Sequence, residues 1–108
     1  MSLVQKHCVP CEGGVAPLSV FQIEEYLKET PNWTVLENKK ISREFKFKNF
    51  VEAMNFVNRV ASLAEAENHH PDIHIFYNKV FLELSTHATN GLSENDFILA
   101  SKIDQVYS

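Results

Sequence analysis

The sequence has no long apolar run and no excess of basic charge, and both absences exclude classes of protein. Nowhere in its 108 residues is there an apolar stretch of the roughly 18–20 residues that a membrane-spanning helix needs. The net charge is −4, which argues against a nucleic-acid partner. The opening residues, MSLVQKHCVPCEGG, also lack the apolar centre of a secretory signal peptide. We therefore expect one cytoplasmic domain with no membrane or nucleic-acid partner.

Cysteine is scarce, and its two copies, Cys8 and Cys11, stand close together as a single CxxC. One such motif supplies at most half of a zinc site, even with His7 beside it. The motif lies within residues 1–17, a segment broken by prolines and glycines. We expect this segment to be a flexible leader with reduced thiols, preceding a single domain over residues 18–108. A metal site or a redox pair is the alternative.

Three segments have the apolar periodicity of amphipathic helices, and each begins at a capping residue. Ser19, Asn49 and Ser93 are the predicted N-caps. Apolar residues then recur at spacings of three and four, and Pro31 ends the first helix. The predicted stripes are Val20, Ile23 and Leu27 in the first helix, Phe50, Met54, Val57, Ala61 and Ala64 in the second, and Leu99, Ile103 and Val106 in the third.

Two further segments alternate apolar and polar residues as half-buried strands do. Residues 33–47 predict one hairpin, and residues 73–84 predict another around a turn at Asn78-Lys79. The order helix, hairpin, helix, hairpin, helix predicts an α+β fold, with a four-stranded antiparallel sheet and three helices packed on one of its faces. Phe76 and Phe81 fall on the other face, where exposed apolar side chains predict a homodimer or homotetramer.

Four of the five histidines lie between residues 69 and 87. The predicted hairpin register places His87 opposite His70, at the end of the sheet where His69 also lies. Three interpretations are open for this cluster: a zinc site, acid/base groups, and surface histidines without chemistry. Two carboxylates are available to it. Glu65 lies one helical turn before His69 and is a candidate hydrogen-bond partner for one of the imidazoles, and Asp96 lies in the first turn of the last helix.

The same residues resemble the signature of the pterin-4a-carbinolamine dehydratases in their bacterial form. The similarity covers about residues 17–107. It rests on a spaced set of motifs rather than on the His-His-Pro triplet alone. The matching residues are Glu65, His69-His70-Pro71, Tyr77-Asn78, Thr86-His87, Gly91-Leu92-Ser93 and Asp96.

This resemblance implies a hydro-lyase that converts 4a-hydroxytetrahydropterin to quinonoid dihydropterin and water, without a metal or cofactor. It implies a role in tetrahydropterin recycling, linked to an aromatic amino acid hydroxylase. His69, His70 and His87 would be the catalytic residues, supported by Glu65 and Asp96. We expect His69 and His87 to be the acid/base pair, with Asp96 orienting His87.

We also expect a substrate contact from the strand that begins at residue 73, and an alternative function is open. Backbone groups around His74, Ile75 and Phe76 would bind the pterin edge, while the His74 side chain itself is expected to be structural. The alternative function is a non-catalytic dimerisation module, or a transcription-regulating binding module, with the same fold.

Overall fold

The computed structural model describes residues 2–9 and 16–107, and it confirms the predicted α+β fold. The three helices are α1 (Val20–Leu27), α2 (Phe50–Glu67) and α3 (Glu94–Tyr107). The four strands are β1 (Thr34–Leu36), β2 (Lys40–Lys46), β3 (Asp72–Phe76) and β4 (Lys79–Leu84). Two short 3-10 helices, η1 (Leu3–Gln5) and η2 (His87–Thr89), complete the described chain. None of the described helices is long and apolar enough to cross a membrane.

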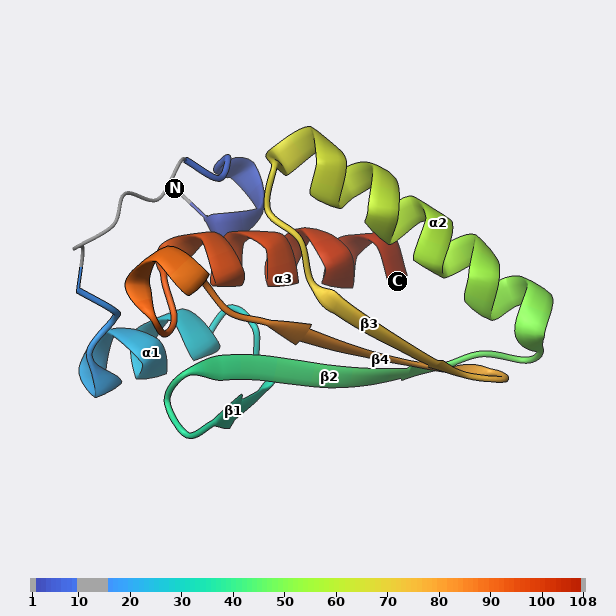
Figure 1. Cartoon of the computed structure of the whole chain (residues 1–108), viewed down its shortest axis with the longest axis horizontal. Helices are drawn as coiled ribbons and strands as arrows, with labels where there is room; N and C mark the ends of the chain where they lie inside the picture. Colours follow the sequence, from blue (N-terminus) through green and yellow to red (C-terminus); the bar gives the residue numbers. More distant parts are fainter. Residues whose placement is uncertain (1, 10–15, 108) are drawn as a thin grey trace.

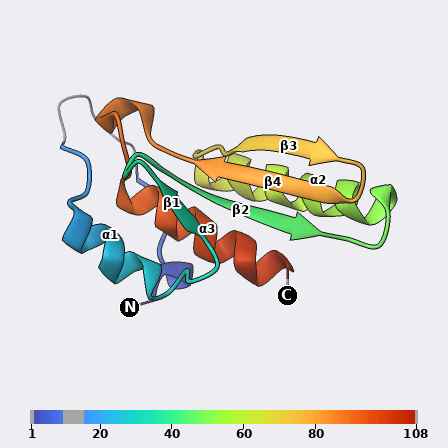
Figure 2. The same ribbon diagram turned by 90° about the horizontal axis from the view of Figure 1, so that it is seen from below.

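The four strands form one antiparallel sheet in the order β1-β2-β4-β3. Figure 1 shows α2 and α3 side by side over one face of this sheet, and Figure 2 shows the sheet in front of both helices when it is seen from below. α1 packs against α3. Because β2 pairs with β4, the two hairpins meet at the centre of the sheet and share a single core.

The core fills the space between the sheet and the helices. Its fully buried members include Ile41 and Phe45 from β2, Val80, Leu82 and Leu84 from β4, Val60 from α2, and Phe97 and Ile103 from α3. The predicted caps are confirmed at two helices. Ser19 and Gln22 form a reciprocal capping box, and the Asn49 side chain accepts a hydrogen bond from the Glu52 amide.

The predicted stripe on α2 was partly wrong. The buried residues of this helix are Ala53, Phe56, Val57, Val60 and Ala64, whereas Phe50 and Ala61 are exposed. Both sets have helical spacing, so periodicity alone could not choose between them. Packing of α2 against α3 and β4 selects the face that is buried.

The predicted turn of the second hairpin was wrong by one residue, and the register therefore differs by two. Asp72 faces Glu83 and Ile73 faces Leu82, so the turn is made by Tyr77 and Asn78. Tyr77 takes a left-handed conformation with φ 54°. Asn78 exchanges hydrogen bonds with the Phe47 backbone, through its side-chain nitrogen (3.0 Å) and its carbonyl oxygen (2.8 Å). His70 precedes β3 and does not face His87 in the ladder.

Part of the predicted leader packs on the domain. Leu3 is 1% exposed and belongs to the core, and η1 lies against α3. Cys8 is a free thiol, and Cys11 lies outside the described residues, so the predicted alternatives for the cysteine pair remain predictions.

Candidate active site

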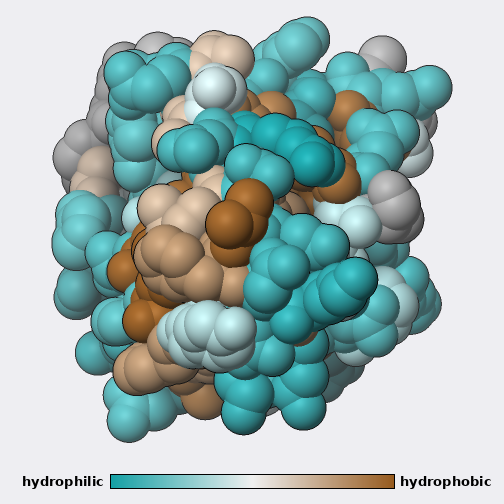
Figure 3. All heavy atoms as spheres, turned by 90° about the vertical axis from the view of Figure 1, so that its right-hand side faces the viewer, coloured by the Kyte–Doolittle hydropathy of each residue, from teal (hydrophilic) through white to brown (hydrophobic). Residues whose placement is uncertain are grey.

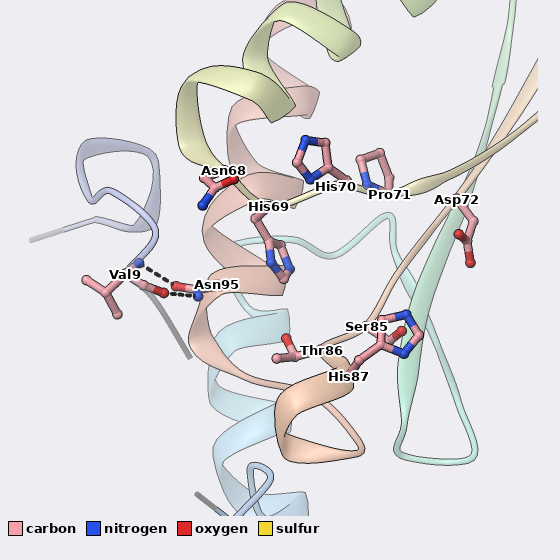
Figure 4. A pocket seen from close by; sticks show the side chains of 10 residues that line it. All are labelled: Val9, Asn68, His69, His70, Pro71, Asp72, Ser85, Thr86, His87 and Asn95. Atoms are coloured by element: carbon pink, nitrogen blue, oxygen red, sulfur yellow. Dashed lines mark hydrogen bonds between the residues drawn. The ribbon is translucent and has the colours of Figure 1, made fainter. Parts of the chain in front are cut away.

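The structure brings His69, His70 and His87 to one cavity of about 500 Å³. The cavity lies where the end of α2, the segment leading into β3, the end of β4 and the start of α3 meet. Figure 4 shows His69 at its centre, with His70 and His87 on the side away from Asn95. Three histidines separated by up to 18 positions in the sequence therefore line one cavity.

A change of chain direction at the end of α2 sets His69 and His70 in place. Asn68 takes a left-handed conformation, with φ 53°, and its amide bonds the Ala64 and Glu65 carbonyls. This conformation is a common way to end a helix, and Pro71 then keeps His70 out of helical geometry. The two histidines thus leave the helix in succession, and the short extended segment lets their rings point in different directions.

His69 is held by a buried carboxylate. Its Nε2 lies 2.6 Å from Asp96 Oδ1, with the two side chains 12% and 0% exposed. The other oxygen, Asp96 Oδ2, accepts hydrogen bonds from Thr86 Oγ1 at 2.8 Å and from the Ser93 amide at 3.0 Å. A carboxylate only accepts, so Nε2 of His69 donates and Nδ1 is the nitrogen left for other partners. The network fixes the ring because each member is tied to the next.

The prediction that Asp96 orients His87 was wrong. Asp96 stands in the first turn of α3 and its oxygens are taken by His69, Thr86 and Ser93. Figure 4 shows the Thr86 side chain toward the centre of the cavity and the His87 ring turned to the other side, next to Ser85. Neighbouring residues in an extended chain point to opposite sides, and Thr86 is the one that faces Asp96.

His70 also has a carboxylate partner, but this pair lies in solvent. Its Nε2 forms a hydrogen bond with Glu65 Oε2, and the side chains are 52% and 78% exposed. The predicted hydrogen bond between Glu65 and one of the imidazoles is therefore confirmed.

His87 stands apart from the other histidines. It is exposed, and its ring forms no hydrogen bond or ion pair with any described residue, whereas its backbone carbonyl accepts a hydrogen bond from the Asn90 amide at 3.1 Å. It is the first residue of η2, in a loop that a bridge between Thr86 and Gly91 closes. Gly91 is required there because a Cβ atom on it would lie 2.8 Å from Pro17 Cβ. Hydrogen bonds between Thr86 and Gly91 hold the backbone of this loop, while no hydrogen bond to a described residue orients the His87 ring.

The three predicted substrate-binding residues of β3 are not brought to the cavity. His74 lies on the outer face of the sheet, where Nε2 is 3.2 Å from Glu83 Oε1 and the ring packs against Phe81. Ile75 and Phe76 are exposed farther along the strand. The structural role expected for the His74 side chain fits its contact with Glu83.

Five lining residues were missed by the predicted site and by the matching motifs, namely Val9, Asn68, Asp72, Ser85 and Asn95. Val9 belongs to the predicted leader, and nothing in its surroundings in the sequence marks it. Asn95 stands next to Asp96, and only its contacts across the fold give it a place in the site. Within the described residues, no group of three histidine, cysteine or acidic side chains is placed to hold a metal ion.

Two ionisable groups beside the cavity have shifted pKa values. Burial, together with the nearby charge of Glu67, raises the pKa of the Cys8 thiol to about 12. Burial alone would raise the pKa of Glu67, but the Cys8 amide, His7 and Lys102 outweigh it and lower that pKa. The thiol is therefore protonated at neutral pH, and Glu67 is ionised there.

Comparison with known proteins gives the family. The model of a family described as pterin 4 alpha carbinolamine dehydratase matches residues 16–106. A Halorhodospira halophila protein, named as a candidate pterin-4-alpha-carbinolamine dehydratase, is 51% identical over 105 residues, which cover 96% of each chain. A relative of the same name from Nitrosospira multiformis is 49% identical over 105 residues, covering 97% of this chain and 92% of its own.

Solved structures agree with these relatives. A transcriptional coactivator/pterin dehydratase from Brucella melitensis superposes with a TM-score of 0.81 at 33% identity, over 85% of this chain and 99% of its own. A pterin dehydratase-like protein that is a RuBisCO assembly factor of the alpha-carboxysome shares the fold, with a TM-score of 0.62 at 19% identity, over 71% of this chain and 90% of its own. On the family match and the identity to its relatives, the chain belongs to the pterin-4a-carbinolamine dehydratase family.

Proposed function

We propose that this chain dehydrates 4a-hydroxytetrahydropterin to quinonoid dihydropterin, using histidines as acid and base. The observation that carries the proposal is the convergence of His69, His70 and His87 on one cavity of about 500 Å³. Clefts of roughly 300–1,000 Å³ suit small ligands, and a bicyclic pterin belongs to that size class.

The reaction needs two proton transfers and one bond cleavage. A base removes the proton from ring N5, the C4a–O bond breaks as the C4a–N5 double bond forms, and an acid protonates the departing hydroxyl to give water. His69 and His87 are the proposed pair, because they line the cavity from different elements and leave space between them. Histidine suits both roles near neutral pH. His70 positions the substrate, with Glu65 holding its ring.

The variant His87→Ala tests the proposal, because His87 contacts no other described side chain by hydrogen bond or ion pair. Dehydration should fall by about 10²- to 10⁴-fold, the usual contribution of one acid or base. The melting temperature should stay the same, since the side chain is exposed. Turnover is followed by absorbance with freshly generated 4a-hydroxytetrahydropterin and no added metal.

His74→Ala is the matched control, since His74 is an exposed histidine outside the cavity. Its turnover should equal that of the unmodified protein. Equal turnover in both variants would reject the role given to His87. If the unmodified protein shows no dehydration anywhere between about pH 6 and 8.5, where histidine titrates, the alternative of a non-catalytic binding module with this fold is favoured.

The proposed physiological setting is tetrahydropterin recycling in the cytoplasm, beside an aromatic amino acid hydroxylase that releases the carbinolamine. The support is membership of the family, whose relatives are named for this dehydration. Deleting the gene in a host that has such a hydroxylase should slow tetrahydropterin recovery, and unchanged recovery would count against this setting.

Self-association is part of the proposal. Exposed apolar side chains gather at the end of the molecule where α2 begins and the β3–β4 turn lies, as Figure 3 shows. Phe50, Val51, Phe76 and Tyr77 are all at least 47% exposed there. Contiguous apolar surface of this kind usually marks an interface. Light scattering should give the mass of a dimer or tetramer, and a monomer at high concentration would count against it.

A further inference from the structure

Among the described residues that line the cavity, Asp72 is the only one with a carboxylate. It is the first residue of β3, directly after Pro71, and it is exposed. No hydrogen bond or ion pair joins its side chain to any other described residue. The carboxylates of Glu65 and Asp96, in contrast, are each bonded to a histidine. Asp72 is therefore the acidic group that the cavity offers to a ligand.

The charge of Asp72 has no use in the fold itself. Asp72 faces Glu83 in the β3–β4 ladder, and like charges directly opposite each other destabilise a sheet. Glu83 has partners of its own, because Lys40 Nζ lies 3.6 Å and His74 Nε2 lies 3.2 Å from its carboxylate oxygens. Neither of these two residues pairs with Asp72. No contact of the described chain thus explains a carboxylate at this position.

Other polar side chains of the cavity are already occupied. The Val9 amide donates to Asn95 Oδ1 at 3.0 Å, and Asn95 Nδ2 donates to the Val9 carbonyl at 2.6 Å, as Figure 4 shows. The Thr86 hydroxyl donates to Asp96 Oδ2 at 2.8 Å. Among the lining side chains, only that of Asp72 offers two equivalent acceptor oxygens. A ligand with two adjacent N–H donors would find its matching acceptor there.

The Asp72 side chain and the His87 ring border the same part of the cavity. Figure 4 shows the Asp72 carboxylate below the segment that carries Pro71, turned toward the level of Ser85 and His87. The strand register agrees, because Ser85 follows Glu83 by two positions and alternation puts it on the same face of the hairpin as Asp72. A ligand beside His87 is therefore within the space that Asp72 lines.

The substrate of the proposed reaction carries such a pair of donors. In a pterin the 2-amino group and ring N3 present two N–H groups side by side, as a guanidinium group does. A carboxylate accepts two parallel hydrogen bonds from an edge of this shape. Carbon C2 lies opposite C4a across the ring, so an acceptor at this edge leaves C4a and N5 free for the histidines.

We propose that Asp72 is a specificity-determining residue, which accepts hydrogen bonds from the 2-amino group and N3 of the bound pterin. This inference rests on the proposed function, because the occupant of the cavity is the pterin of that reaction. It gives β3 a contact with substrate at its first residue, whereas Ile75 and Phe76 lie farther along the strand, away from the cavity.

Kinetics of Asp72→Asn test this contact. The amide keeps the size of the side chain but turns an NH₂ group toward one of the two N–H donors. KM should rise by about 10- to 100-fold, the effect of one or two hydrogen bonds to a charged group, and kcat should stay within about 3-fold. The melting temperature should not fall, since the side chain is exposed and the change removes the like charge opposite Glu83.

Glu83→Gln is the matched control, because it removes a carboxylate from the neighbouring strand that does not line the cavity. Its KM should equal that of the unmodified protein. An unchanged KM in Asp72→Asn as well would overturn the role of Asp72.

Binding of two probes, measured by titration calorimetry, identifies the edge that Asp72 contacts. The probes are 7,8-dihydrobiopterin and its analogue in which hydrogen replaces the 2-amino group. The unmodified protein should bind the analogue about 10-fold more weakly, since one hydrogen bond to the carboxylate is missing. In Asp72→Asn the two Kd values should agree within about 3-fold, because the group that recognises the amino group has been removed.

The outcomes separate this inference from the proposed function. Equal Kd values for both probes in the unmodified protein, or a difference that persists in Asp72→Asn, overturn the role of Asp72 while the dehydration stands. If the unmodified protein binds 7,8-dihydrobiopterin without catalysing dehydration, the proposed function fails and the Kd values still decide the role of Asp72. No binding of either probe by the unmodified protein overturns both.

Discussion

The adjacent residues His69 and His70 each pair with a carboxylate, and the two pairs differ in burial. His69 and Asp96 are 12% and 0% exposed, whereas His70 and Glu65 are 52% and 78% exposed. Water screens the second pair and competes for its hydrogen bonds, so it adds little to stability. The first pair is shielded from water and tied to Thr86 and Ser93. Adjacent positions in a motif can therefore have different physical roles.

Among changes to the two pairs, Asp96→Asn in the buried pair should have the largest effect on stability and dehydration. The amide offers one acceptor oxygen where the carboxylate offers two, so one present donor would face an NH₂ group. We expect the free energy of unfolding to fall by about 3 kcal/mol and dehydration to fall by about 10²-fold. Urea denaturation and the absorbance assay measure the two effects. A variant as stable and active as the unmodified protein would show that the buried pair is not what holds His69.

A smaller effect is expected from Thr86→Val, which keeps the shape of the side chain and removes its hydroxyl. Asp96 then loses one donor, and the hydrogen bond of 2.7 Å between the Thr86 and Ser93 hydroxyls is lost as well. The free energy of unfolding should fall by about 1–2 kcal/mol, and turnover should drop by about 10-fold as His69 loses its fixed orientation. Thr86→Ser, which restores the hydroxyl, should recover most of the turnover. If serine fails to recover it, packing of the threonine methyl group is the cause instead.

The smallest effect should come from Glu65→Gln in the exposed pair. The amide can still bond His70, and solvent replaces what is lost, so the free energy of unfolding should change by less than about 0.5 kcal/mol. Turnover should stay within about 3-fold, because His70 positions the substrate rather than moving a proton. A loss as large as that of Asp96→Asn would mean that the exposed pair is the catalytic one, and the contrast would be reversed.

The sequence predicted those features that depend on neighbouring residues. The caps at Ser19 and Asn49 formed as expected, because each bond joins residues three positions apart. The hydrogen bond of Glu65 with an imidazole was predictable for the same reason, since the two lie around one end of α2. The order of helices and hairpins followed from the change in apolar period along the chain.

Features that depend on contacts between distant segments could not be predicted from the sequence. The turn lies at Tyr77-Asn78 because Asn78 bonds the Phe47 backbone, 31 positions away. Asp96 bonds His69 rather than His87 because α3 lies against the end of α2. Val9 and Asn95 are 86 positions apart, and no local pattern relates them. In each case the partner was set by packing, which one sequence does not display.

The pairing of the N-terminal segment with Glu67 and Asn95 has a consequence for the order of folding. During synthesis residues 2–9 leave the ribosome before the anchors of Cys8 and Val9, which follow 59 and 86 positions later. Until then Cys8 and Val9 lack these partners, and closing so long a loop costs conformational entropy. Cys8 and Val9 therefore dock as a late event, after the part of the domain that carries Glu67 and Asn95 has been made.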